Sequence, residues 1–125
     1  MTWLLVALGG AAGSALRYGV NLGAIAMLGV SWPYGTFIVN VLGSFALGVV
    51  MEALGGRMLA GVDLRLVLGT GLLGGFTTYS SFNLETIRLW EQGAQGRAAA
   101  YAIATAVVCL GAGFLGLVAA RALKG

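Results

Sequence analysis

The sequence predicts an all-α membrane protein built from four transmembrane helices. Of its 125 residues, 59% are hydrophobic and 9% are charged, whereas soluble domains carry roughly a quarter charged residues. The apolar residues form four runs, each long enough for the about 20 residues that a helix needs to cross a bilayer. These runs are continuously apolar and lack the alternation of membrane β-strands. We therefore expect one four-helix domain over residues 1–125, a multi-pass protein of a cell inner membrane or plasma membrane.

The first helix is expected from Thr2 to Val30. Its apolar run resembles a signal peptide, but no basic segment precedes it, so a transmembrane helix is the better interpretation. The next three helices are expected over Tyr34 to Leu54, Leu64 to Leu89 and Ala98 to Leu123. Gly, Pro and polar residues mark the short connections between them, at residues 31–34, 55–57 and 91–96.

The third run contains an unusual polar stretch, G-G-F-T-T-Y-S-S-F-N, from Gly74 to Asn83. Paired glycines precede threonine and serine hydroxyls, which compete with the helix for backbone hydrogen bonds. We therefore predict that this helix breaks within the membrane. Carbonyls freed by a break persist there only if they are buried in protein, line water or bind a cation. If two copies met antiparallel at this point, the freed carbonyls of both could hold one small cation.

The 22 glycines are expected to serve close helix packing. Small residues let helix backbones approach each other in lipid. Gly9-x-x-x-Gly13 and Gly71-x-x-x-Gly75 have the typical spacing, and the second run offers only the looser pair of Gly43 and Gly48.

The basic residues say little about orientation. With four spans, one side of the membrane carries four basic residues and the other carries two, which is a weak positive-inside bias. A chain that inserts both ways and forms an antiparallel dimer, and a chain with one fixed orientation, both fit this count. The basic residues are scattered singly, so a nucleic-acid partner is not expected. They are Arg57, Arg65, Arg121 and Lys124 on one side, and Arg88 and Arg97 on the other.

The sequence does not favour an enzyme. It has no histidine and only four acidic residues, so neither a Ser-His-Asp triad nor a histidine-based metal site can be assembled. Its single cysteine, Cys109, excludes an internal disulfide. The pattern GxGxxG at residues 69–74 lies inside an apolar run rather than between a strand and a helix, which rules out dinucleotide binding.

Two polar residues within apolar runs are candidate functional residues. Arg17 either extends to the membrane interface beside Tyr18, or its charge attracts an anion or locks a neighbouring helix end. Asn40 either joins two helices by hydrogen bonds or lines a pore, where a donor without formal charge can hold an anion briefly and release it.

Aromatic and polar residues after the predicted break are further candidates. Tyr79 and Phe82 are three residues apart and share a helix face, and Tyr101 and Thr105 share a face of the fourth helix. Aromatic rings have a positive edge against which an anion can lie. Hydroxyl and amide groups stand nearby at Ser80, Ser81 and Asn83.

Three motifs together resemble the Fluc family of small fluoride channels, also called CrcB. They are G-G-A-A-G-S-A-L-R-Y at residues 9–18, G-T-F-I-V-N-V-L-G-S-F at residues 35–45 and G-G-F-T-T-Y-S-S-F-N-L-E at residues 74–85. The resemblance covers essentially the whole chain. It implies a dual-topology antiparallel homodimer of four-helix subunits, with two fluoride pores and a structural sodium ion at the broken third helices. Fluoride would leave the cytoplasm passively, without ATP.

The resemblance also assigns roles to individual residues. The backbone carbonyls of Gly74 and Thr77 would bind the sodium ion. Pore residues would be Asn40, Tyr79 and Phe82, with polar groups from Ser80, Ser81 and Asn83, and with Tyr101 and Thr105 beside the pore.

One departure stands at Tyr79, where the family usually has phenylalanine. The phenol hydroxyl could donate a hydrogen bond to fluoride or narrow the pore, and it leaves open a heterodimer of two related chains. Two other functions remain to be separated from a fluoride channel. A dual-topology, proton-coupled multidrug or cation exporter would need a membrane carboxylate, for which Glu85 is the candidate. An assembly subunit would transport nothing by itself.

Overall fold

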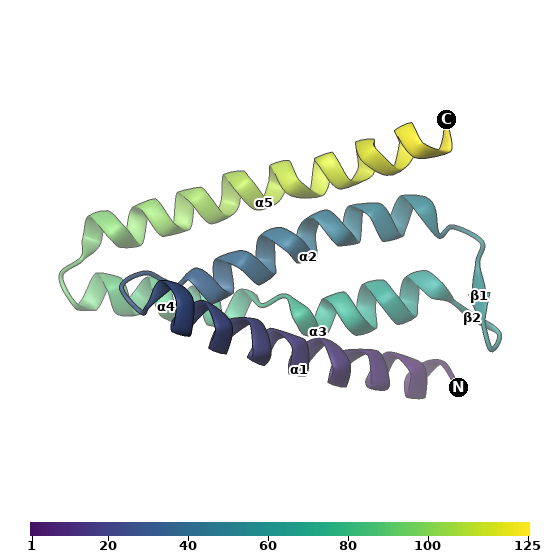
Figure 1. Cartoon of the computed structure of the whole chain (residues 1–125), viewed down its shortest axis with the longest axis horizontal. Helices are drawn as coiled ribbons and strands as arrows, with labels where there is room; N and C mark the ends of the chain where they lie inside the picture. The colour runs from purple at the N-terminus through teal and green to yellow at the C-terminus, as the bar shows by residue number, and fades with distance from the viewer.

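The computed structural model describes all 125 residues and is almost entirely helical (Figure 1). Four α-helices are long: α1 (Thr2–Leu28), α2 (Tyr34–Ala53), α4 (Tyr79–Glu91) and α5 (Gln95–Lys124). Four short elements join α2 to α4. They are the strands β1 (Met58–Leu59) and β2 (Val62–Asp63), the π-helix η1 (Arg65–Leu73) and the short helix α3 (Gly74–Phe76).

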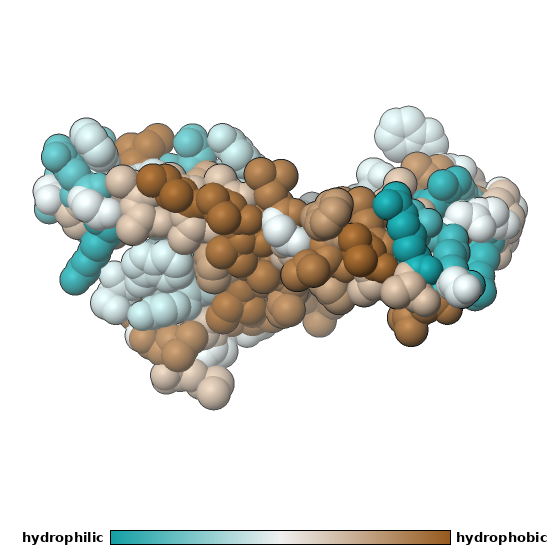
Figure 2. Space-filling view, turned by 90° about the horizontal axis from the view of Figure 1, so that it is seen from above, coloured by the Kyte–Doolittle hydropathy of each residue, from teal (hydrophilic) through white to brown (hydrophobic).

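The fold is that of an all-α membrane protein. Three helices, α1, α2 and α5, are long and apolar enough to cross a membrane, and the third apolar run is divided among η1, α3 and α4. Figure 2 shows hydrophobic residues over the middle of the molecule and hydrophilic residues at both ends. Only 19 of the 125 residues are buried, so most apolar side chains are left to face lipid or another protein.

The first helix and the third run pack through the two predicted glycine motifs. A Cβ atom added at Gly9 would lie 2.8 Å from the carbonyl oxygen of Val67, and one at Gly71 would lie 3.0 Å from that of Val6. A Cβ atom at Gly75 would lie 2.5 Å from the carbonyl oxygen of Gly10. The two backbones are thus in direct contact, and no larger residue fits between them.

Helices α2 and α5 pack in the same way. A Cβ atom at Gly48 of α2 would lie 2.9 Å from the backbone nitrogen of Leu117, and one at Gly116 of α5 would overlap the carbonyl oxygen of Phe45. At the end of this pair, Arg121 Nε bonds to Glu52 Oε2 at 3.1 Å. The C-terminal turn of α5 is therefore tied to that of α2.

Several predicted boundaries were wrong. The first helix ends at Leu28 instead of Val30, because Gly29 has a φ of 83° and terminates it. The last helix begins at Gln95 instead of Ala98, since the connection before it needs only residues 92–94.

The second connection is longer than predicted and forms a β-hairpin. β1 pairs with β2 antiparallel, and the turn places Ala60 and Gly61 at φ values of 51° and 79°. Behind the hairpin, Arg65 bonds to Asp63 through its side chain, with Nη2 2.6 Å from Oδ2, and through its backbone nitrogen. These hydrogen bonds lower the pKa of the Asp63 carboxyl.

The two termini and the hairpin lie at one end of the molecule, and the connections at residues 29–33 and 92–94 lie at the other (Figure 1). The basic residues predicted to share a side therefore do share an end. This end carries Arg57, Arg65, Arg121 and Lys124.

Candidate functional site

The third run is interrupted at two residues, Thr77 and Thr78, whose backbones are extended with ψ values of 159° and 119°. The Thr77 hydroxyl donates to the carbonyl oxygen of Leu73 at 2.9 Å and closes the end of α3. The Thr78 hydroxyl accepts from the backbone nitrogen of Ser81 at 3.2 Å, so Thr78 is the N-cap of α4. The predicted break is present. It lies at the threonines, however, and not at the paired glycines, which are helical.

Asn40 of α2 pairs with the extended peptide of Thr78. Its Nδ2 donates to the carbonyl oxygen of Thr78 at 2.9 Å, and its Oδ1 accepts from the backbone nitrogen of Thr78 at 2.8 Å. The side chain is buried and joins the second and third runs, as one of its two interpretations required. An amide nitrogen carries two hydrogens, so one N–H of Asn40 has no partner within the chain.

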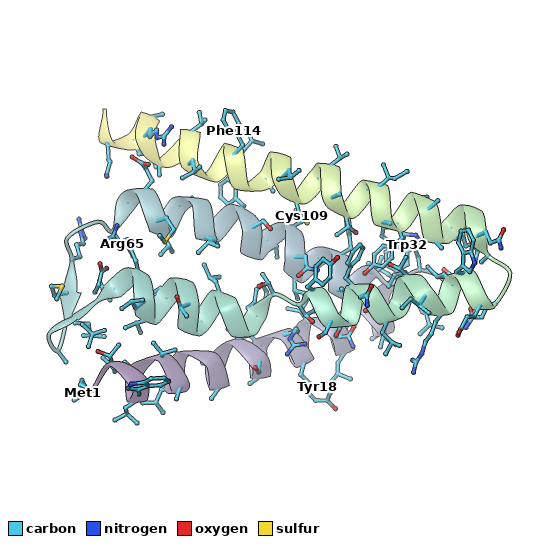
Figure 3. The ribbon with its side chains drawn as sticks, turned by 180° about the vertical axis from the view of Figure 1, so that it is seen from behind. Met1, Tyr18, Trp32, Arg65, Cys109 and Phe114 are labelled. Carbon is cyan, nitrogen blue, oxygen red and sulfur yellow. The ribbon has the colours of Figure 1, made fainter.

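Arg17 of α1 bonds to the other side of the break. Its Nε donates to the carbonyl oxygen of Gly75 in α3 at 3.2 Å. The guanidinium therefore locks a neighbouring helix end, one of the interpretations offered for it. The adjacent Tyr18 is exposed and points away from the bundle (Figure 3).

A row of aromatic rings begins at the break. Tyr79 lies 5.6 Å from Phe82, Phe82 lies 5.2 Å from Tyr101, and Tyr101 lies 5.0 Å from Trp32, measured between ring centroids. The outer end of the row is open, since Tyr79 is 77% exposed, whereas Tyr101 is fully buried. Trp32 lies in the connection before α2 and is also 5.2 Å from Phe37 of α2.

An open cavity of about 560 Å³ lies beside this row. Four predicted pore residues line it: Asn40, Tyr79, Phe82 and Thr105. The buried hydroxyls of Thr105 and Tyr101 have no hydrogen-bond partner within the chain. Buried polar groups are normally paired. Thr105 lines the cavity, so its hydroxyl is open to a ligand or water there, whereas Tyr101 is fully enclosed within the chain.

The other predicted residues lie elsewhere. Ser81 and Arg17 line a smaller polar cavity of about 230 Å³, and Ser81 also lines a cavity of about 420 Å³ at the end of the molecule opposite the termini. Ser80 is exposed, with its hydroxyl 3.4 Å from that of Thr78. Asn83 is exposed and lines none of these three cavities.

Two contacts at the site were not predicted. The Thr36 hydroxyl donates to Glu85 Oε1 at 2.6 Å, which places the only carboxylate of α4 near the membrane core against α2. Trp32, assigned from the sequence only to a connection, packs against the buried Tyr101 with the two rings nearly perpendicular. The only feature of the sequence that could have indicated either contact was the position of Glu85 just after the hydroxyl-rich stretch.

Two backbone carbonyls at the break could bind a cation. The amides of Thr77 and Thr78 donate to Leu73 O and Asn40 Oδ1, so the carbonyl of Gly74 loses its usual helical donors. The carbonyl of Thr77 accepts no hydrogen bond within the chain. Oxygens of unwound membrane helices are typical ligands of sodium. The oxygens of Gly74 and Thr77 therefore fit such an ion and could hold it.

Comparisons with known proteins match nearly the whole chain to one family. The family model described as "CrcB-like protein, Camphor Resistance (CrcB)" matches residues 4–117. The chain is 50% identical to a protein named "Fluoride-specific ion channel FluC" from Sorangium cellulosum, over 97% of this chain and 95% of the relative. Proteins of the same name from Agrobacterium fabrum and Caulobacter vibrioides are 46% and 47% identical, over 95% and 94% of both chains respectively.

Proposed function

Because the chain belongs to the CrcB family, whose matching curated members are named fluoride-specific ion channels, we propose that it is a fluoride-selective channel of the cell membrane. Fluoride would leave the cytoplasm passively, down its electrochemical gradient, and the cell would be protected from the ion. No chemical reaction is needed for this function.

The observation that carries the proposal is the set of neutral groups around the open cavity. Asn40 retains one amide hydrogen, Thr105 has an unpaired hydroxyl, and the rings of Tyr79 and Phe82 lie at the same cavity. A small anion must exchange its hydration shell for donors as it enters a membrane. Amide and hydroxyl groups, together with the positive edges of rings, provide this exchange without a full charge that would trap the ion.

A second copy of the chain would complete the pathway. The cavity is open on the side of Tyr79, which is 77% exposed at the start of α4. We propose that an antiparallel partner covers this side, so that a homodimer contains two fluoride pores. The weak charge bias between the two ends supports insertion in both orientations. A heterodimer with a related chain would use the same surface.

A structural sodium ion is part of the proposal. The carbonyl oxygens of Gly74 and Thr77 would bind it from each subunit. The ion would supply positive charge to oxygens that otherwise have no partner in the membrane, where an unpaired backbone group is costly.

Flux from liposomes that contain the purified protein tests the function. We expect fluoride efflux that is driven by the fluoride gradient alone, and no chloride efflux under the same gradient. Protein-free liposomes control for leakage. Equal chloride flux would refute selectivity, and efflux of organic cations coupled to protons would favour an exporter with Glu85 as its carboxylate. No flux from the protein alone would favour an assembly subunit.

A further inference from the structure

Cys109 of α5 lines the same open cavity as the proposed pore residues. It is the only cysteine of the chain and is partly exposed. The cavity measures about 560 Å³, whereas one water molecule takes up about 30 Å³ of the liquid. The chain therefore leaves room beside the thiol for water and for a small ligand.

The cavity has two polar walls, each formed by two residues that are one helical turn apart. Asn40 and Ser44 of α2 form one wall, and Thr105 and Cys109 of α5 form the other. Residues four apart share a helix face and are separated by about 6 Å along the helix axis. A group bound to the sulfur of Cys109 would thus share the cavity with the hydroxyls and the amide that are proposed to receive fluoride.

The hydroxyl of Thr105 indicates, independently of the cysteine, that this wall receives a ligand. Its side chain is only 7% exposed and lines the cavity, and its oxygen has no hydrogen-bond partner within the chain. A buried hydroxyl without a partner is costly, so a ligand or water in the cavity is needed to satisfy it. One turn further along α5, Cys109 adds a sulfur to the same wall.

We propose that Cys109 is a binding site for soft, thiol-seeking metal ions such as mercury, and that a metal bound there closes the fluoride pathway. Soft metals prefer sulfur ligands, and the cavity has no other sulfur among its lining residues. The inference rests on the proposed function, because closure has a meaning only if fluoride passes through this cavity.

Methylmercury is the simplest probe, since it forms a strong bond to one sulfur. The thiol proton passes to the buffer, a bond forms between sulfur and mercury, and the anion that accompanied methylmercury is released. No electron is transferred. The bound group is uncharged, so it would close the pathway by filling space beside Thr105 and Ser44, where fluoride needs donors in place of its hydration shell.

Labelling and fluoride efflux are measured on the same liposomes. Because the wild-type chain has a single thiol, mass spectrometry should find one methylmercury group per chain. The labelled wild-type protein should lose fluoride efflux, and dithiothreitol, which removes the metal, should restore it. Recovery excludes unfolding as the cause of the loss. Cys109→Ser should take up no label, and its efflux should be the same with and without the reagent.

A second cysteine position on α5 provides the matched control. Val107 is 64% exposed and lines none of the three cavities described above. The double variant Cys109→Ser, Val107→Cys should therefore be labelled without any loss of efflux. A loss in this variant would show that a label anywhere on α5 stops conduction, and the inference would be wrong.

The wild-type chain alone can also overturn the inference. Undiminished efflux from fully labelled protein would show that Cys109 lies outside the pathway, and an absence of labelling would show that the thiol is inaccessible. Either result would leave the proposed function intact. An absence of fluoride efflux before the reagent is added would instead refute the proposed function and, with it, the role of Cys109.

Discussion

Tyr79 carries a hydroxyl at the first position of α4, where the resemblance places a phenylalanine. Its ring contacts Phe82 and its side chain is 77% exposed, so the hydroxyl contributes little to the stability of a single subunit. In the proposed dimer it would lie in the fluoride pathway. We therefore expect Tyr79→Phe to fold normally and to conduct fluoride at a rate different from that of wild type.

Fluoride efflux from liposomes measures this effect. Tyr18→Phe removes the same hydroxyl from a residue that is 66% exposed and points away from the bundle, so it should conduct like wild type. Identical rates for Tyr79→Phe and wild type would show that the hydroxyl plays no part in conduction.

Asn40 has two roles that substitution can separate. Asn40→Asp places a negative charge at the cavity and replaces the donor to Thr78 with an oxygen. The charge would repel fluoride, and the lost hydrogen bond would weaken the contact that holds the break. We therefore expect fluoride efflux to be abolished. Asn40→Ala also removes the hydrogen bonds to Thr78 but adds no charge.

Efflux and unfolding temperature are measured for both variants. If the added negative charge is what blocks fluoride, Asn40→Ala should retain fluoride efflux and Asn40→Asp should lose it, although the two variants unfold at similar temperatures. Unimpaired efflux in Asn40→Asp would rule out a pore position for Asn40.

The partners of Asn40 and Arg17 could not be predicted, although both residues were identified as functional candidates. A polar side chain in an apolar run must find hydrogen-bond partners, and this need is visible in the sequence. Here the partners are backbone groups of Thr78 and Gly75, which are 38 and 58 residues away. Every residue has such groups, so only the geometry of the break selects these two.

At the scale of the elements, the contact between α1 and the third run depends on glycine. A Cβ atom at Gly13 would overlap the carbonyl oxygen of Leu72 and lie 2.8 Å from the backbone nitrogen of Phe76. We expect Gly13→Ala to separate the two elements and to reduce stability by about 1 to 3 kcal/mol. The unfolding transition of the purified protein in detergent gives this difference.

Gly19→Ala is the matched control in the same helix, since a Cβ atom there would have no neighbour within 4 Å. It should be neutral or slightly stabilising, because alanine favours a helix over glycine. Equal effects of the two substitutions would show that helix propensity, and not the contact with the third run, determines the result at Gly13.

The helices were predictable from hydropathy, whereas two local features of the third run and the hairpin before it were not. An apolar run has the same composition whether it winds as an α-helix or as the π-helix η1. The paired glycines stay helical because Gly75 packs against the backbone of Gly10, a contact that requires the tertiary structure. The hairpin at residues 58–63 shows no alternation of apolar and polar residues that would have indicated strands.

At the scale of the whole molecule, one subunit leaves large apolar side chains exposed over its middle (Figure 2). The membrane class followed directly from composition, because lipid accepts such a surface. The surface that meets lipid and the surface proposed to meet a second copy are both apolar, so hydropathy cannot separate them. The open cavity lined by Tyr79 and Thr105 marks the proposed interface instead.

The position of both chain ends at one pole of the subunit (Figure 1) limits how two copies could be encoded as one polypeptide. In an antiparallel pair, the last residue of the first copy and the first residue of the second lie on opposite sides of the bilayer. A flexible tether cannot join them, however long it is. A tandem gene would need an additional hydrophobic helix between its halves, and duplication without such a helix would force both copies into the same orientation.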